Sequence, residues 1–229
     1  MPAHLITGAG SGIGAVLAGR LAERGDDLWL LARDARRAAE LRERFPGART
    51  LVGDLGDPAK LAWALGHQEL PVELDSLLHV AGVVELGPVG DLPVKVWNDT
   101  LGVNLVAPAE LTRLLLPSLR LAKGHVVFVN SGAGLRAGAE WAAYAASKHG
   151  LKALADALRE EEHAGGVRVT SVYPGRTATA MQVKVHQQEG RSYDAGRWIE
   201  PESVARAVLA ALDASRDAEI TDITVRPGH

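Results

Sequence analysis

Short apolar runs alternate with longer amphipathic stretches along the whole chain, and this alternation limits the folds that the chain can adopt. Seven runs are nearly continuous in apolar residues, which is typical of strands buried on both faces of a parallel sheet. They are AHLITGAG (3–10), DLWLLAR (27–33), ARTLVGDL (48–55), LDSLLHVAG (74–82), GHVVFVNSGAG (124–134), GVRVTSVYPG (166–175) and ITDITVRPG (220–228). The first run leads directly into a glycine-rich turn.

Helical spacing marks the segments between these runs. The expected helices cover 15–25, 34–45, 58–68, 104–122, 141–164 and 201–212, and Pro117 should disturb the fourth. Repeated strand–helix units with right-handed crossovers give a doubly wound sheet. No linker divides the chain. We therefore expect an α/β protein with one domain, residues 1–229, built on a parallel sheet of about seven strands with helices on both faces.

The turn after the first strand, TGAGSGIG (7–14), holds four glycines in seven residues. A flexible turn would explain them poorly, because each glycine costs conformational entropy on folding. Without Cβ atoms the backbone can approach a pyrophosphate, and the following helix directs free N–H groups and its positive dipole end toward it. The pattern is TGxxxGxG rather than GxGxxG, since Ile13 stands where the latter needs glycine. It predicts a dinucleotide site.

The end of the second strand, Leu31-Ala32-Arg33, bears on which dinucleotide binds. Folds of this kind commonly place an acidic residue there to bind the ribose 2′-OH of NAD. Arg33 offers a guanidinium instead, which suits a 2′-phosphate. NADP(H) is therefore favoured over NAD(H), although Asp34 follows directly and Arg36 and Arg37 are equally consistent with a solvated helix face. Asp54 is either an acceptor for the adenine amino group or a turn residue.

A tyrosine and a lysine stand four apart in AYAASKHGLKA (143–153) and would project from one helix face. A phenol with its ordinary pKa near 10 is a poor base at neutral pH, and a nearby ammonium should lower that pKa. Tyr144 and Lys148 are thus candidates for acid–base catalysis. Ser131 ends the fifth strand and could hold a substrate oxygen beside Tyr144. Asn104 could organise a water that relays protons to Lys148, or simply cap a helix.

These motifs together resemble the short-chain dehydrogenase/reductase family, in its one-domain Rossmann-fold form, over essentially the whole chain. TGAGSGIG (7–14), AG (81–82), YxxxK (144–148) and YPG (173–175) occur in the family's order and spacing. The resemblance implies that Tyr144 is the catalytic acid/base and that Lys148 tunes it and binds a ribose. Ser131 would bind the substrate oxygen and Asn104 would anchor the proton relay.

The resemblance also implies a set of cofactor contacts and a substrate lid over about 177–200. Hydroxyls after YPG would bind the nicotinamide carboxamide. The full set of expected cofactor residues is Gly8, Ser11, Gly12, Ile13, Gly14, Arg33, Asp54, Leu55, Ala81, Gly82, Tyr144, Lys148, Pro174, Gly175, Thr177 and Thr179. The family usually has asparagine where this chain has Val80, which removes one bond that steadies the central strand. The C-terminal ending resembles the branch with carbonyl reductases and hydroxy-acid or serine dehydrogenases.

Composition argues against other classes of protein. The net charge is −3 without a basic block, so nucleic acid is not an expected partner. The sequence has no cysteine, no HExxH motif and no apolar run of about 20 residues, so we expect no metal and no membrane span. We expect a cytoplasmic homodimer or homotetramer, as the resemblance implies, with helices 107–121 and 141–164 pairing between subunits. Its expected substrate is a small carbonyl or alcohol compound.

Two alternatives remain from the sequence. A serine hydrolase could use Ser131, but its context is VNSG rather than GxSxG, and no His/Asp pair follows in the required order. A catalytically idle NADP(H)-binding sensor or scaffold could use the same fold, because fold alone does not prove activity. Such a protein has no need of Tyr144 and Lys148, and this chain keeps both. The sequence therefore favours an oxidoreductase that transfers a hydride.

Overall fold

One parallel sheet organises the computed structural model, which describes residues 1–228. Its seven strands lie in the order β3-β2-β1-β4-β5-β6-β7, and all pairs are parallel. Every expected strand is present, shorter than its apolar run. The strands are β1 Ala3–Thr7, β2 Asp27–Ala32, β3 Arg49–Val52, β4 Ser76–His79, β5 His125–Val129, β6 Arg168–Pro174 and β7 Asp222–Val225. The predicted doubly wound α/β fold is confirmed.

Eight α-helices accompany the strands within the described residues. They are α1 Gly12–Glu23, α2 Ala35–Arg44, α3 Leu61–Gly66, α4 Val94–Leu101, α5 Ala107–Ala122, α6 Ala142–Glu162, α7 Ala180–Gln188 and α8 Pro201–Leu212. The sequence analysis did not anticipate α4 or α7. Helix α7 lies within the expected lid segment, and the Thr179 side chain caps it by accepting a hydrogen bond from the N–H of Gln182. No helix of residues 1–228 combines the length and apolar character needed to cross a bilayer.

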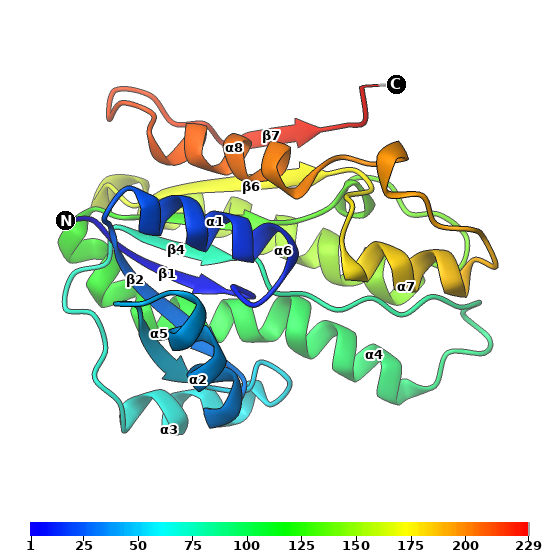
Figure 1. The fold of residues 1–229 in the computed structure, drawn as a ribbon, viewed down its shortest axis with the longest axis horizontal. Helices are drawn as coiled ribbons and strands as arrows, with labels where there is room; N and C mark the ends of the chain where they lie inside the picture. Colours follow the sequence, from blue (N-terminus) through cyan, green and yellow to red (C-terminus); the bar gives the residue numbers. More distant parts are fainter. Residues whose placement is uncertain (229) are drawn as a thin grey trace.

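Helices cover the sheet on both faces and create two apolar cores (Figure 1). Helices α1, α2 and α8 pack on one face, where Leu17, Leu41 and Val208 join the sheet residues in a single buried cluster. Helices α3, α5 and α6 pack on the other face through residues such as Leu115 and Leu151. Strands buried from both sides explain why their sequences are nearly continuous in apolar residues.

The strand order reverses between β1 and β4, and this reversal positions the functional site. From β1 the chain builds outward through β2 and β3, then returns to place β4 on the other side of β1. In sheets of this kind ligands bind outside the carboxyl ends of the strands at such a point. In Figure 1 the arrowheads of β1, β4 and β6 point toward α7, which lies at this end of the sheet.

A short π-helical segment, Gly102–Val106, joins α4 to α5. It contains Asn104, so the expected bend at that residue is present, while a helix cap at Asn104 is not. Single turns of π-helix inside longer helices are frequent at functional sites. Helix α5 continues through Pro117 instead of breaking there. Pro117 has no N–H to donate to the carbonyl oxygen of Arg113, four residues earlier. Both residues lie on the exposed face of the helix, where water can hydrate that carbonyl.

Candidate active site

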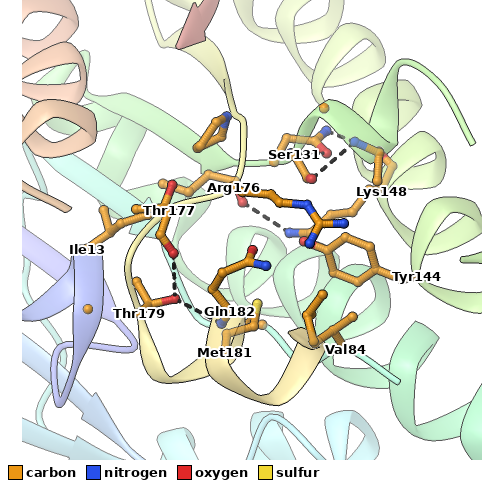
Figure 2. Close-up of a pocket in the computed structure, with 18 of the residues that line it drawn as sticks. Ile13, Val84, Ser131, Tyr144, Lys148, Arg176, Thr177, Thr179, Met181 and Gln182 are labelled. Atoms are coloured by element: carbon orange, nitrogen blue, oxygen red, sulfur yellow. Dashed lines mark hydrogen bonds between the residues drawn. The ribbon is translucent and has the colours of Figure 1, made fainter. Parts of the chain in front are cut away.

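A cavity of about 700 Å³ opens at the carboxyl ends of the central strands (Figure 2). This volume is within the usual range for small-molecule and cofactor sites. The cavity brings together most of the residues predicted from sequence. Its lining includes Gly8, Ser11, Gly12, Ile13, Gly14, Ala81, Gly82, Ser131, Tyr144, Lys148, Pro174, Gly175, Thr177 and Thr179. The predicted residues outside this lining are Arg33, Asp54, Leu55 and Asn104.

The glycine turn forms one end of the cavity, and its geometry requires glycine. Gly8 has a φ of +76°, and a Cβ there would lie 2.9 Å from the backbone nitrogen of Ala81. A Cβ on Gly14 would lie 2.3 Å from the carbonyl oxygen of Gly8, because the first turn of α1 passes directly against the turn. Ser11 precedes α1 in an extended conformation, and its hydroxyl makes no capping hydrogen bond.

This arrangement fits the pyrophosphate of a dinucleotide. The first backbone N–H groups of α1 have no partner within the helix, and they adjoin the cavity at Gly12, Ile13 and Gly14. The uncommitted hydroxyl of Ser11 adds a further donor. The turn therefore offers several uncharged donors and a helix dipole to an anion.

Tyr144 and Lys148 lie on α6 and are both buried, with 7% and 3% of their surfaces exposed. The Lys148 ammonium lies 5.8 Å from the centre of the Tyr144 ring. It donates a hydrogen bond of 3.1 Å to the carbonyl oxygen of Val129, the last residue of β5. Helix α6 and the end of β5 thus fix the two side chains at the floor of the cavity, as their spacing predicted.

Burial controls the protonation of both groups. It lowers the pKa of Lys148 from 10.5 to about 8, so this side chain remains largely an ammonium at neutral pH. Burial raises the pKa of Tyr144, and the Ser131 side chain opposes that rise. Burial is the larger effect, so the pKa of Tyr144 lies above rather than below its ordinary value, and tuning by Lys148 stays a prediction. The phenol is protonated at neutral pH.

Ser131 follows β5 and lines the cavity with Tyr144. Its hydroxyl accepts a hydrogen bond of 3.1 Å from the N–H of Ala133 and so caps a short 3₁₀ turn, Gly132–Gly134. This contact is the turn role that a serine commonly has. In this contact the hydroxyl oxygen of Ser131 is the acceptor, so its proton remains available for donation. Ser131 can therefore be a turn residue and still donate to an oxygen atom in the cavity.

Asn104 is buried behind the cavity rather than in its lining. Its side chain exchanges two hydrogen bonds of 2.8 Å with the backbone N–H and C=O of Val83, and donates a third of 3.0 Å to the hydroxyl of Ser147. Its side-chain oxygen also lies close to Gly82, where an added Cβ would be 3.3 Å away. Asn104 thus holds the AG segment against α6.

The residues expected at the adenosine end lie on the surface. Arg33 bonds to the neighbouring Asp34 at 3.3 Å, and 63% of its side chain is exposed. Asp54 accepts a hydrogen bond of 2.8 Å from the N–H of Gly56, which is the turn role considered from the sequence. The Arg37 side chain packs against the glycine turn. A Cβ added to Gly10 would lie only 2.5 Å from its Nη2 atom. The sequence analysis gave a solvated helix face as one interpretation of Arg37.

The end of β4 is well hydrogen-bonded although position 80 is valine, where the family usually has asparagine. The Thr7 hydroxyl accepts hydrogen bonds of 3.0 and 3.1 Å from the N–H groups of Val80 and Ala81. The neighbouring His79 stacks on Phe128 with ring centres 4.9 Å apart. The side chain of Thr7, at the end of β1, therefore joins the two strands that flank the point of reversal.

Helix α7 is fastened across the cavity by contacts with the segment after β4. The Lys184 ammonium bonds to the carbonyl oxygen of Val84 at 2.9 Å and to the carboxylate of Glu85 at 2.6 Å. The Gln188 side chain accepts a hydrogen bond of 3.2 Å from the N–H of Leu86. Met181, on the same helix, lines the cavity. Helix α7 thus borders the cavity, and its role as a substrate lid stays a prediction.

Further residues line the cavity, and the sequence analysis did not single them out. They are Arg136, Trp141, Arg176 and Gln182. Arg176 follows Pro174-Gly175 directly, and this position after the sixth strand was the available signal. Among residues 1–228, no cluster of His, Cys, Asp and Glu is arranged to hold a metal ion.

Comparison with known sequences agrees with this arrangement. A family model described as short chain dehydrogenase matches residues 3–190. An uncharacterized oxidoreductase of Staphylococcus saprophyticus is 27% identical over 230 residues, covering 97% of this chain and 96% of the relative. Dehydrogenase/reductase SDR family member 7B of Bos taurus is 33% identical, covering 91% of this chain and 69% of the relative.

Comparison with solved structures gives the same fold. A protein of Shigella flexneri described as a short chain dehydrogenase complexed with NADP has 28% identity and a TM-score of 0.84, covering 97% of this chain and 96% of that one. A 4-hydroxyisoleucine dehydrogenase complexed with NADH has 25% identity and a TM-score of 0.84, covering 100% and 98% of the two chains. Structures of this fold thus bind either nicotinamide cofactor.

Proposed function

Because the chain belongs to the short chain dehydrogenase family, we propose that it is an oxidoreductase that transfers a hydride between NADP(H) and a carbonyl or secondary alcohol. The observation that supports this most is the meeting of three features in one cavity. The glycine turn, Ser131 and the Tyr144–Lys148 pair all contribute to its lining. The first feature suits a dinucleotide, and the other two suit a substrate oxygen that gains or loses a proton.

The cavity residues divide into cofactor contacts and proton-handling groups. The turn and the first N–H groups of α1 would hold the pyrophosphate, and Lys148 would bind a ribose with the N–H groups that Val129 does not use. Thr177 and Thr179 would bind the carboxamide. When bound, the nicotinamide supplies or accepts the hydride, which is chemistry that no side chain provides. Arg33, with Arg37 over the glycine turn, would favour the 2′-phosphate of NADP.

The raised pKa of Tyr144 keeps the phenol protonated, and this is the state needed to donate a proton in the reducing direction. A protonated phenol and the Ser131 hydroxyl can both donate to a carbonyl oxygen and polarise it. As negative charge develops on that oxygen, Tyr144 can transfer its proton. The nearby Lys148 ammonium would then stabilise the phenolate. In the oxidising direction the same groups would receive the alcohol proton.

Replacement of Tyr144 by phenylalanine tests the proposal. Tyr144→Phe removes only the hydroxyl, so we expect turnover to fall by about 10³-fold or more while NADPH still binds. Loss of NADPH absorbance with a panel of aldehydes and ketones measures turnover, and fluorescence titration measures NADPH binding. An idle sensor or scaffold would bind NADPH without turnover in the unaltered protein.

Tyr173→Phe is the matched control. Tyr173 is buried in β6 and lies outside the cavity lining, and its hydroxyl has no hydrogen-bond partner among the described residues. Turnover should survive its loss. If both variants kept turnover, Tyr144 would not be the proton donor. Oligomeric state and cellular location stay predictions, which light scattering and fractionation can test.

A further inference from the structure

The geometry points to a substrate that carries a carboxylate, held by Arg176 at the substrate side of the cavity. This inference rests on the proposed function and deepens it by naming the class of substrate. Three cationic side chains line the cavity, namely Arg136, Lys148 and Arg176. No Asp or Glu of residues 1–228 lines it. A neutral substrate would gain little from such a lining.

Arg176 is held in a fixed position by three neighbours. Its guanidinium carbon lies 5.8 Å from the ring centre of Trp141 and 5.4 Å from that of Trp198, so the cation is placed between two aromatic rings. It also donates two hydrogen bonds to the carboxylate of Glu189, at 2.7 and 2.5 Å. A long side chain fixed in this way loses little further entropy when it binds an anion.

The position of Arg176 is close to the reacting groups. Trp141, which Arg176 contacts, also contacts Tyr144, with ring centres 5.7 Å apart. Figure 2 shows the Arg176 side chain extending across the cavity toward Tyr144. A substrate whose carbonyl is bound at Tyr144 could therefore present a second group to Arg176.

The guanidinium keeps donors for a ligand although it is paired with Glu189. Both bonds to Glu189 come from the two terminal nitrogens, one from each, and a guanidinium has five N–H groups. Three N–H groups, including that on Nε, thus have no acceptor among the described residues. About a quarter of the Arg176 side chain is exposed. A carboxylate matches the planar arrangement of these donors.

The ion pair with Glu189 reduces the net charge at Arg176. The Glu189 carboxylate offsets one unit of charge, and the Arg176 guanidinium holds the pKa of Glu189 below its usual range, so the pair stays ionised at neutral pH. A second small cavity of about 340 Å³ also has Arg176 in its lining, together with Arg191, Arg197 and Asp194. Arg176 thus borders both cavities.

The test replaces the ion pair by an amide pair of similar shape. Arg176→Gln combined with Glu189→Gln removes both charges and leaves no buried carboxylate unpaired. Turnover is measured for 2-oxo, 3-oxo and 4-oxo acids and for the methyl ester of each. In the unaltered protein, at least one acid should have a kcat/KM above that of its ester. In the double variant, KM for that acid should rise about 30- to 100-fold and KM for the ester should stay the same.

A binding measurement separates this inference from the proposed function. Butanoate and its neutral analogue butanamide cannot be reduced here, and Trp141 and Trp198 report their binding by fluorescence in the presence of NADP. We expect butanoate to bind the unaltered protein, butanamide to bind much more weakly, and the double variant to lose butanoate. Arg206→Gln, on the exposed surface of α8, is the control and should behave as the unaltered protein.

Each outcome decides between the two ideas. Equal losses for acid and ester in the double variant would overturn the inference, because the ion pair would then be merely structural. Failure of butanoate to bind, with esters reduced as well as acids, would overturn it while the proposed function stands. Binding of butanoate through Arg176 without reduction of any carbonyl compound would support the inference and overturn the proposed function.

Discussion

Burial disfavours the charged forms of both Tyr144 and Lys148, but the two side chains reach neutral pH in different states. The pKa of Tyr144 is raised, so the phenol is neutral. The pKa of Lys148 falls only to about 8, so most of its population is charged. Confining this ammonium costs about 3 kcal/mol at pH 7, since each pKa unit corresponds to about 1.4 kcal/mol. Burial of Lys148 at the floor of the cavity therefore reduces the stability of the fold.

Lys148→Met should raise the free energy of unfolding and abolish turnover. The gain at pH 7 should be about 2 kcal/mol, which is the burial cost of the ammonium less one lost hydrogen bond. Between pH 8 and 10.5 the unfolded chain keeps a proton on Lys148 that the folded chain has lost. The stability of the unaltered protein therefore rises with pH in this window relative to the variant. Urea unfolding at pH 7, 8.5 and 10 measures both effects, and a difference independent of pH would contradict the lowered pKa.

The sequence predicted which residues meet in the cavity better than it predicted the contacts and protonation of each. YxxxK spacing on a helix was enough to place Tyr144 and Lys148 together. It could not show the depth of burial, which depends on the packing of distant elements and sets both pKa values. Asn104 was expected to organise a water, and this role stays a prediction. Its amide nitrogen donates to Val83 and Ser147, and its oxygen accepts from Val83. Arg176 was not singled out, because only the folded chain brings it near Trp141 and Tyr144.

At the scale of elements, the contact between the glycine turn and α1 is the tightest feature of the cofactor end. Gly14→Ala would place a methyl group 2.3 Å from the carbonyl oxygen of Gly8. The helix and turn must then separate, and we expect a loss of about 2 kcal/mol or more in stability together with a large loss of NADPH affinity. Thermal unfolding and fluorescence titration measure these effects.

Gly19→Ala, on the same helix, is the matched control. A Cβ at Gly19 would meet no atom within 4 Å. The substitution should stabilise α1 by up to about 1 kcal/mol, because alanine has the higher helix propensity, and NADPH affinity should not change. If Gly14→Ala behaved like Gly19→Ala, close contact between turn and helix would not explain the glycine.

The proposed preference for NADP(H) rests on Arg33, which lies between β2 and α2. Arg33→Ala should weaken NADPH at least 10-fold and leave NADH nearly unchanged, because only NADPH has a 2′-phosphate for a guanidinium to bind. Dissociation constants for the two cofactors measure this. Arg36→Ala is the control, since Arg36 bonds to Glu40 on the exposed side of α2. Equal losses for both cofactors would remove the basis for proposing NADP(H).

Elements with a clear sequence pattern were predicted, and short elements without one were not. All seven strands were visible as apolar runs. Both faces of β1, β2, β4, β5 and β6 are largely buried, whereas the edge strands β3 and β7 are partly exposed. Helix α7 was missed because its sequence, AMQVKVHQQ, has no continuous apolar face. Pro117 was expected to disturb α5, but the helix continues because that turn faces solvent. Helix propensity alone does not indicate which face of a helix is exposed to solvent.

At the scale of the whole molecule, two buried histidines link stability to pH. Burial lowers the pKa of His79 and of His125 from 6.5 to about 3. The unfolded chain therefore binds protons between pH 6.5 and 3 that the folded chain excludes, and stability falls as the solution is acidified through this range. Each histidine should contribute a loss of about 2 kcal/mol between pH 7 and pH 5.

Substitution by glutamine tests this contribution. His79→Gln and His125→Gln keep a polar group near Thr112 and Thr170, which now bond to the two rings at 2.9 and 2.7 Å. Whatever each variant does to stability at pH 7, its further loss on going to pH 5 should be about 2 kcal/mol smaller than that of the unaltered protein. Urea unfolding at the two pH values measures this difference. An unchanged difference would show that the rings are accessible to protons in the folded state.

The packing of α8 on α1 has a consequence for biosynthesis. The two helices lie side by side (Figure 1) and share one apolar cluster, with Arg20 bonded to Glu202, 182 positions later, and Arg24 to Asp213, 189 positions later. On the ribosome, α1 emerges long before α8. Until α8 follows, only the sheet covers α1, and the apolar cluster that the two helices share stays incomplete.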